Sequence, residues 1–263
     1  MSQPVAVIGA NFGDEGKGLV TDYVVSQAKG DVLVVRYNGG AQAGHTVITP
    51  EGIRHVFHHF GSGTLLGAAT YLSRFFIVNP ILWKKERDEL RRIGAPELKL
   101  WVDPRALITT PYDMLVNQEI ERIRNNWRYG SCGLGIHETQ ARNAKFIGTN
   151  VGHSDIKGAC EQIRRDWAEQ RVYEMTEERP SSLFRERIKS DTLLYNYLND
   201  FDEFLAAVNF TETLPGAENV VFEGAQGLLL DENHPFFPFV TQSDSHEVRE
   251  FEERRAATGP NRR

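Results

Sequence analysis

The sequence predicts an α/β fold, with a mostly parallel central sheet flanked by helices. Three observations near the start of the chain predict it. The apolar run "PVAVIGA" (4–10) ends in glycine and is typical of a buried strand. The stretch 19–28 carries apolar residues at helical spacing, and "DVLVVRYN" (31–38) forms a second buried strand. A strand–loop–helix–strand unit of this kind begins a parallel sheet.

The rest of the chain extends the same pattern. Further strands are expected at 54–60, 74–80, 98–104 and 218–231, with amphipathic helices at 81–93 and 113–128. The charge-rich stretch at about 152–200 predicts helices that form an accessory layer outside the core. No internal repeat interrupts the pattern, so we expect one domain over residues 1–263.

Composition narrows the classes of function. The 263 residues are 40% hydrophobic and 25% charged, with a net charge of -6, which argues against a nucleic-acid partner. Cys132 and Cys160 form no C-x-x-C pair, so neither a disulfide framework nor a zinc site is expected. The start of the chain lacks the features of a signal peptide, and no apolar run approaches the roughly 20 residues that cross a bilayer. We therefore expect a cytoplasmic protein without a membrane partner.

The stretch "GANFGDEGKGLV" (9–20) nearly matches a phosphate-binding P-loop and then departs from it. Gly18 follows Lys17 where a P-loop has the hydroxyl residue that binds Mg²⁺. Glycines at 13, 16 and 18 allow a close approach of the backbone to a ligand, and Lys17 suits a terminal phosphate. The acids Asp14 and Glu15 make sense beside phosphate if a carboxylate binds Mg²⁺ or takes a proton. The alternative is a glycine-rich turn with solvated acids.

A second loop, "RYNGGAQAGHTV" (36–47), follows the second strand and contains His45 and Thr46. His45 could bond a phosphate oxygen or act as an acid near neutral pH, and the alternative is a capping histidine in a tight turn. A ligand site is favoured, because open α/β sheets bind ligands where neighbouring strands end.

Two later stretches add polar groups. In "GSCGLGIHETQAR" (130–142), Ser131 and Cys132 with nearby amides could hold an anion, and Arg142 could supply charge. Cys132 has no evident base partner in sequence, which disfavours a nucleophilic role. In "FEGAQGLLLDENHPFFPFVTQSDS" (222–245), the Gln226 amide can read one edge of a purine, and Thr241 is a second phosphate contact. The strand histidines His58 and His59 receive no functional assignment.

These motifs resemble the signature blocks of the adenylosuccinate synthetase family. "GDEGKG", "NGGAQAGHT" and "FEGAQGLLLD…PFVTQS" resemble three of its blocks in the family's order, and "GSCGLGIHET" falls where its phosphate loop lies. The resemblance covers about residues 3 to 245 and implies a P-loop-related architecture and a homodimer. It also implies a reaction in which a nucleoside triphosphate phosphorylates the O6 of a purine nucleoside monophosphate. The amine of L-aspartate then displaces the phosphate.

The resemblance implies roles for single residues. Asp14 would remove the purine N1 proton and bind Mg²⁺, with the Gly44 carbonyl completing the metal shell, and His45 would stabilise charge on the leaving phosphate. Lys17 would hold the transferred phosphoryl group, within a nucleotide site made of Gly13, Glu15, Gly16, Lys17, Gly18, Gly44, His45 and Thr46. The purine monophosphate would contact Asp14, Gln42, Ser131, Cys132, Arg142, Gln226 and Thr241, with Arg142 reaching into a neighbouring subunit.

The chain also departs from the family pattern. Gln42 stands where the family usually has Asn, Ser131-Cys132 replace two Thr, and "FHHFGSGT" (57–64) replaces a more aliphatic segment. These variants resemble the phage-type branch, which joins aspartate to dGMP to give 2-amino-2'-deoxy-N6-succinyladenylate. Some members of that branch carry Ser at the position of Asp14. This chain keeps Asp14. On the variant loops, the acceptor is expected to be dGMP, with IMP as the alternative, and the donor GTP or ATP/dATP.

The C-terminal end differs most. "ATGPNRR" (257–263) resembles the family's aspartate-binding loop, with Pro260 in the place of its first arginine, which makes Thr258, Arg262 and Arg263 candidate aspartate ligands. Only about ten residues separate this stretch from the fourth block, so the family's C-terminal region is expected to be shortened or missing. A non-catalytic nucleotide-binding relative remains an alternative. A P-loop kinase or GTPase is disfavoured by the missing hydroxyl after Lys17.

Overall fold

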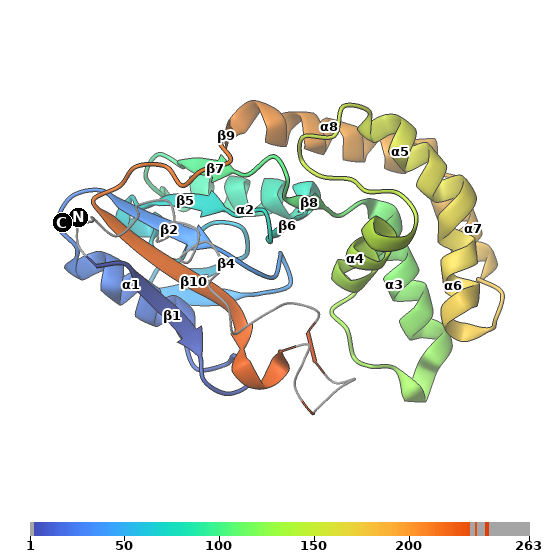
Figure 1. Cartoon of the computed structure of the whole chain (residues 1–263), viewed down its shortest axis with the longest axis horizontal. Coiled ribbons are helices and arrows are strands. Elements are labelled where there is room, and N and C mark those ends of the chain that lie inside the picture. The colour runs from blue at the N-terminus through green and yellow to red at the C-terminus, as the bar shows by residue number, and fades with distance from the viewer. Residues whose placement is uncertain (1–2, 232–234, 236–239, 242–263) are drawn as a thin grey trace, which may run out of the picture.

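A six-stranded, wholly parallel sheet forms the centre of the protein, as the computed structural model shows (Figure 1). The structure describes residues 3–231, 235 and 240–241. Across the sheet the strands follow the order β1 (Val5–Gly9), β10 (Asn219–Gly227), β2 (Val32–Arg36), β5 (Ala69–Leu72), β7 (Leu100–Val102) and β9 (Asn209–Phe210). The predicted α/β class is confirmed.

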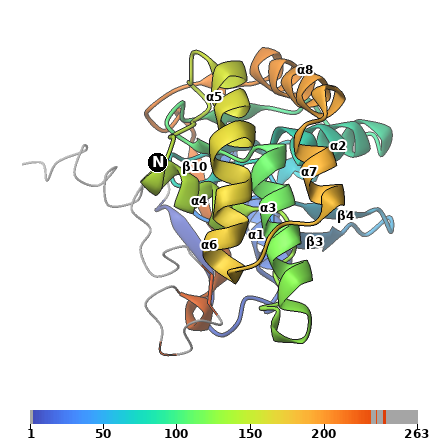
Figure 2. The same ribbon diagram turned by 90° about the vertical axis from the view of Figure 1, so that its right-hand side faces the viewer.

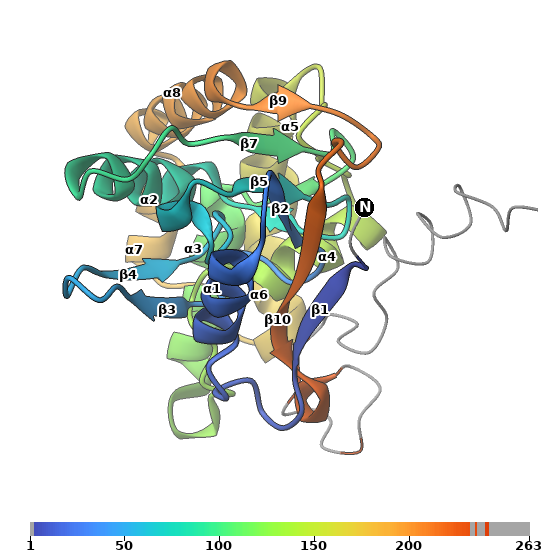
Figure 3. The same cartoon turned by 90° about the vertical axis from the view of Figure 1, so that its left-hand side faces the viewer.

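The last long strand of the described chain lies inside the sheet. Figure 3 shows β10 between β1 and β2, and the register places Val221 opposite both Val5 and Val34. The same register pairs Arg36, the last residue of β2, with Glu223 in the middle of β10. Strands β1 and β2 from the start of the chain therefore run parallel to β10 on either side of it, and the carboxyl ends of all three face the same way.

Helix α1 (Lys17–Gln27) covers one face near the β1 edge, where Val25 packs with Val7 and Val34. A hairpin of β3 (His45–Ile48) and β4 (Arg54–Phe57) follows β2, and β6 (Ile77–Val78) pairs with β8 (Leu107–Ile108). The sequence placed His45 and Thr46 within a loop, but they begin β3. It also expected a strand at 74–80, of which only β6 is formed, and it did not predict β5, a four-residue strand with weak alternation.

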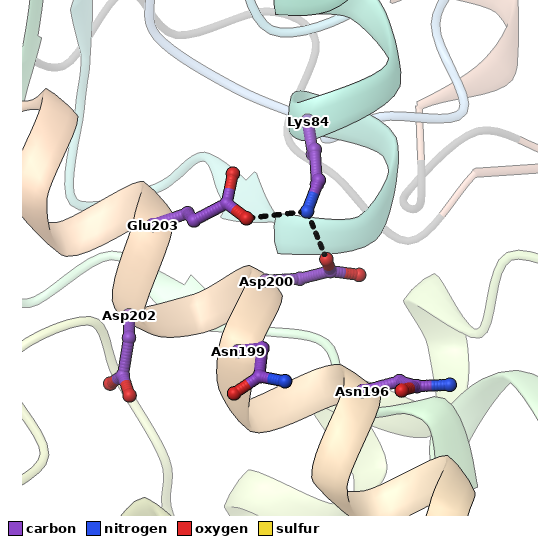
Figure 4. Close-up of a pocket in the computed structure, with 6 residues that line it drawn as sticks. All are labelled: Lys84, Asn196, Asn199, Asp200, Asp202 and Glu203. Atoms are coloured by element: carbon purple, nitrogen blue, oxygen red, sulfur yellow. Dashed lines mark hydrogen bonds and ion pairs between the residues drawn. The ribbon is translucent and has the colours of Figure 1, made fainter.

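Helices α2 (Pro80–Arg92) and α8 (Asp191–Ala207) pack together beside the sheet. Asn79 caps α2 by accepting from the Leu82 amide at 3.2 Å, and Pro80 fills its first turn. Lys84 of α2 reaches Asp200 at 3.1 Å and Glu203 at 2.6 Å on α8 (Figure 4). The shallow cavity beside these groups, about 640 Å³, opens between the two helices. Such exposed ion pairs contribute little to stability individually.

A helical layer faces the carboxyl edge of the sheet (Figures 1 and 2). It consists of α3 (Pro111–Arg124), α4 (Ile136–Lys145), α5 (Ile156–Gln162), the π-helical turn η3 (Ile163–Trp167), α6 (Ala168–Thr176) and α7 (Ser182–Ile188). Short 3-10 turns complete the described chain: η1 (Thr64–Leu66), η2 (Asn125–Trp127) and η4 (Leu228–Leu230). The helices predicted for 152–200 are formed, and together with α3 and β8 they enclose a buried apolar cluster. None of the described helices combines the length and apolar character needed to cross a bilayer.

Candidate active site

The four glycine-rich stretches meet at the carboxyl edge of the sheet. The loop after β1 and the end of β10 touch backbone to backbone: the Leu229 amide donates to the Asn11 carbonyl at 2.9 Å, and a Cβ on Gly227 would lie 2.2 Å from that same oxygen. The loop after β2 is tied to β10 by the Ala225 amide, which donates to the Asn38 side chain at 2.9 Å. A Cβ on Gly40 would lie 2.9 Å from the side chain of Ile136, the first residue of α4.

The loop between β1 and α1 is folded around its own charged groups. The Glu15 carboxylate accepts hydrogen bonds from the backbone amides of Asn11 at 2.9 Å and Gly13 at 3.1 Å. The hydrogen bond from Gly13 is the main cause that lowers the pKa of Glu15. The Lys17 ammonium donates to the Gly13 carbonyl at 2.8 Å. Gly16 adopts a φ of 83°, the left-handed conformation that favours glycine, directly before the helix begins. The Glu15 carboxylate thus binds the amides of Asn11 and Gly13, two donors of the kind that could bind a phosphate.

Asp14 and Lys17 differ in exposure. Asp14 is exposed at the outside of the loop, whereas Lys17 is almost fully buried, and burial lowers the pKa of its ammonium. Gly18, the next residue, lies against β3, because a Cβ there would come within 2.9 Å of the His45 Cβ. The first helical turn of α1 and the histidine predicted from the second loop are therefore neighbours.

His45 is the buried first residue of β3 and contacts β10 through both ring nitrogens. Its Nδ1 lies 2.6 Å from a carboxylate oxygen of Glu223, and its Nε2 lies 3.4 Å from the Ala225 carbonyl. Burial lowers the pKa of the His45 imidazole, and the Glu223 carboxylate opposes this effect. A neutral ring that donates from Nδ1 fits this arrangement.

Glu223 is a fully buried carboxylate that the sequence reading did not single out. Burial alone would raise its pKa, but the charges of His45 and Arg36, with hydrogen bonds from His45 and Ser62, lower the pKa to about 2. Ser62 bonds the carboxylate through its amide at 3.1 Å and through its hydroxyl. Arg36 lies opposite Glu223 in the sheet register, with its guanidinium 4.0 Å away.

The loop after β2 is held in place by a histidine from β4's end. His58 Nδ1 lies 2.9 Å from the carbonyl oxygens of both Ala41 and Ala43, so the ring N–H donates to these two backbone acceptors of the loop. The side-chain amide of Gln42 is buried, and among the residues that the structure describes it has no hydrogen-bond partner. Gly44 is exposed, and so is Thr46. A buried amide without a partner is costly, and it is the kind of group that a polar ligand would satisfy.

The loop before α4 presents its two small polar residues on the surface. Ser131 accepts from the Asn117 side chain at 2.9 Å, and the oxygen of the same side chain accepts the Gly135 amide at 3.3 Å. Cys132 is exposed and unpaired, and it lines a shallow pocket of about 390 Å³ with Ser131 and Arg128. Gly135 allows α4 to start against α3, since a Cβ would lie 2.6 Å from the Asp113 backbone.

Arg142 does not join this loop. It is fully buried, with Nε and one terminal nitrogen bound to the two oxygens of Asp113 at 2.8 Å and 2.9 Å. Its other donors reach the carbonyls of Ile147 and Ile108. Such a bidentate buried pair ties α4 to α3. Within this chain the guanidinium that the resemblance assigns to the purine monophosphate is thus held by Asp113 and two backbone carbonyls.

The remaining predicted residues lie at or beyond the end of β10. Gln226 is partly exposed, and its backbone packs on Gly13 of the first loop. The amide of Thr241 donates to the Leu230 carbonyl at 2.8 Å, which returns the chain to the end of η4. The predicted aspartate ligands Thr258, Arg262 and Arg263 lie outside the described residues.

The donor groups fit Mg²⁺ only in combination with a phosphate ligand. No group of three or more His, Cys, Asp or Glu side chains suited to a metal occurs in the described part of the chain. Mg²⁺ commonly takes one or two carboxylates together with substrate phosphates and waters, and does not need an all-protein cage. The exposed carboxylate of Asp14 and the carbonyl of exposed Gly44 match that kind of donor set.

Comparisons with known proteins agree with the geometry. The family model for adenylosuccinate synthetase matches residues 6–251. Curated adenylosuccinate synthetases are similar in sequence: one from a Synechococcus species is 34% identical over 253 residues and one from Thermoplasma acidophilum is 33% identical over 246 residues, each match covering 91% of this chain. The chain spans about half the length of these relatives, 54% in both cases.

Two solved structures share the fold. The fully ligated adenylosuccinate synthetase from Plasmodium falciparum matches with a TM-score of 0.64 at 21% identity, covering 95% of this chain and 58% of that one. A succinoaminodeoxyadenylate synthetase from cyanophage S-2L, bound to dGMP and dATP, matches with a TM-score of 0.54 at 18% identity, covering 93% and 57%. Because the family model matches residues 6–251 of the 263 in this chain, the chain belongs to the adenylosuccinate synthetase family.

Proposed function

We propose that this chain carries the phosphoryl-transfer site of a purine nucleotide–aspartate ligase. A nucleoside triphosphate would phosphorylate the purine O6, and L-aspartate would displace the phosphate to form a C–N bond. The observation that carries the proposal is the convergence of the loops after β1 and β2 with the end of β10 at one sheet edge. Open α/β sheets bind nucleotides at this edge.

The roles follow the chemistry of the groups. Asp14, the exposed carboxylate of the first loop, would take the purine N1 proton, which makes O6 a better nucleophile. Lys17 and the amides of the glycine loop would hold the transferred phosphoryl group, once the phosphate displaces the Glu15 carboxylate from the Asn11 and Gly13 amides. His45 would stabilise charge on the leaving phosphate. Gln226 and the buried Gln42 amide would contact the purine nucleotide, with Ser131, Cys132 and Thr241 near its monophosphate.

Mg²⁺ belongs to this proposal as the partner of the triphosphate. Asp14 and the Gly44 carbonyl would hold it, and when bound it would neutralise charge on the transferred phosphoryl group. The metal would then not need a hydroxyl ligand at Gly18, because Asp14 and the Gly44 carbonyl would be its protein ligands. Thr258 and Arg262 are proposed as aspartate ligands.

For the acceptor, we propose dGMP. Gln42, Ser131 and Cys132 resemble the phage-type branch, and the cyanophage protein bound to dGMP and dATP shares the fold. The alternative acceptor is IMP, because the similar curated relatives are adenylosuccinate synthetases. GTP and ATP or dATP are the candidate donors. A homodimer and a cytoplasmic location complete the proposal.

The test is an assay of the 263-residue chain with L-aspartate, Mg²⁺, either monophosphate and either triphosphate, with products identified by mass. The proposal expects a succinyl adduct formed from dGMP in preference to IMP. Formation of the adduct from IMP alone would support the alternative acceptor. Triphosphate binding without any adduct would instead indicate a nucleotide-binding relative that lacks the ligase activity.

A further inference from the structure

We propose that Glu223 is a positioning residue that fixes the orientation and tautomer of the His45 ring. The inference rests on the proposed function, which places His45 beside the leaving phosphate. It assigns a task to a buried carboxylate that touches none of the proposed substrates.

The hydrogen bonds around Glu223 define the tautomer. A carboxylate only accepts hydrogen bonds, so Nδ1 of His45, 2.6 Å away, must carry a proton and donate it. A neutral ring then has a lone pair on Nε2, and the 3.4 Å distance from Nε2 to the Ala225 carbonyl is too long for a strong hydrogen bond. Nε2 is therefore the ring nitrogen left for a phosphate: in the neutral ring it can take the proton of a phosphate hydroxyl, and once protonated it donates to a phosphate oxygen and stabilises its charge. Carboxylates that hold the far nitrogen of a histidine perform this task in serine hydrolases and zinc sites.

The neighbouring side chains of Arg36 and Ser62 keep the Glu223 carboxylate ionised and fix its orientation. Arg36 and Glu223 are partners in the sheet register, and both side chains are fully buried. The amide and hydroxyl of Ser62 both bond the carboxylate, which fixes its rotation. Two strands and the segment after β4 thus hold one carboxylate against one imidazole.

The substitution Glu223→Gln tests the inference with a side chain of the same shape. The carboxylate accepts from His45 Nδ1, the Ser62 hydroxyl and the Ser62 amide, whereas glutamine has one acceptor oxygen and an NH₂ group. His45 Nδ1 and the Ser62 hydroxyl bond one carboxylate oxygen and the Ser62 amide bonds the other, so the NH₂ group must face either the Ser62 amide or the other two groups. In the first case His45 keeps a hydrogen bond, but to a neutral and weaker acceptor. We expect kcat to fall by roughly 10-fold or more with KM changed by less than about threefold, the range typical of orienting partners. The ¹⁵N shifts of the His45 ring should change, because Nδ1–H loses its charged acceptor or the ring changes tautomer.

Two further variants separate positioning from folding. Ser62→Ala removes one of the three bonds and should give a smaller fall in kcat in the same direction, even if Glu223→Gln folds poorly. Glu119→Gln removes a buried carboxylate that pairs with Arg122 and accepts the Ser181 amide, far from His45. It should leave kcat and the His45 signals unchanged. His45→Gln identifies those signals by their loss.

The outcomes distinguish the two proposals. Unchanged His45 ring shifts in Glu223→Gln, with kcat within about twofold of the parent chain, would overturn the positioning role. A parent chain that forms no adduct, but whose His45 ring shifts change in Glu223→Gln and not in Glu119→Gln, would reject the ligase proposal and leave the orientation of His45 by Glu223 supported.

Discussion

At the scale of single residues, the two adjacent acids of the loop between β1 and α1 are Asp14 and Glu15. Both acids are exposed, and Glu15 accepts the amides of Asn11 and Gly13. Glu15 thus links two amides of the loop, and Asp14 is the carboxylate that we propose binds the metal and takes the proton. The sequence could identify the pair as unusual but could not separate them, because their orientation depends on the left-handed turn at Gly16.

Asp14→Ala should abolish turnover while leaving nucleotide binding largely intact. Loss of the proposed base should cost roughly 10²–10⁴ in kcat, whereas the loop amides and Lys17 still bind phosphate. Steady-state kinetics and titration calorimetry with the triphosphate measure the two effects. Asp202→Ala, at an exposed position on α8, is the control. An Asp14 variant with full activity would remove this residue from the mechanism.

The low pKa of Glu223 predicts acid sensitivity. The carboxyl has a pKa of about 2 in the folded protein and near its usual 4.5 when unfolded, so its contribution is present above pH 4.5 and is lost as the pH falls toward 2. The full difference corresponds to about 3 kcal/mol. Urea unfolding from pH 6 to pH 3 should show a steeper loss of stability in the parent chain than in Glu223→Gln. Parallel profiles would contradict the shift.

At the scale of elements, the sequence predicted the parts that are locally encoded. The first strand–loop–helix–strand unit, α2, α3 and the strand within 218–231 are confirmed. The strands are apolar runs, and α2 and α3 carry N-terminal capping signals, whereas α1 has no side-chain cap. The position of β10 between β1 and β2 could not be predicted, because it depends on contacts between distant segments. For the same reason the sequence did not single out Glu223, whose neighbours in sequence are buried strand residues. The pairing of Arg142 with Asp113 likewise depends on a contact between distant segments and was not predicted.

The contact between the first loop and β10 predicts an intolerant glycine. Gly227→Ala would place a Cβ 2.2 Å from the Asn11 carbonyl and 2.4 Å from the Gly13 amide, both backbone atoms that cannot move without opening the loop. We expect a loss of about 1–3 kcal/mol in the free energy of unfolding, together with weaker triphosphate binding. Gly216→Ala, with nothing within 4 Å of the added Cβ, is the matched control and should be neutral or slightly stabilising. Equal stability of the two variants would show that the contact is unimportant.

The segment 57–60 supports the second loop, which predicts a change in local dynamics. His58→Phe keeps a ring of similar size but removes the donor to the Ala41 and Ala43 carbonyls. Amide hydrogen exchange in residues 41–45 should become roughly 10-fold faster, equivalent to about 1.4 kcal/mol of lost local stability. His153→Phe, in the loop before α5, should leave exchange in 41–45 unchanged. Unaltered protection in the His58 variant would mean that this histidine does not hold the loop.

At the scale of the whole molecule, a parallel sheet and a helical layer enclose one edge at which the glycine-rich loops meet (Figure 1). The chain spans about half the length of its curated relatives, and the match includes all four motif blocks. The groups proposed to move phosphate and protons therefore lie within the described residues, apart from the proposed aspartate ligands. Catalysis by such a site depends mainly on positioning and charge stabilisation.

The most direct test of the central claim follows the purine oxygen. If the triphosphate phosphorylates O6 and aspartate then displaces the phosphate, a monophosphate labelled with ¹⁸O at that position must transfer the label to the released phosphate. Mass spectrometry of the phosphate formed with dGMP or IMP, Mg²⁺, triphosphate and L-aspartate measures this transfer. The account predicts labelled phosphate that depends on aspartate and disappears in Asp14→Ala. Unlabelled phosphate, or release that is independent of aspartate, would contradict it.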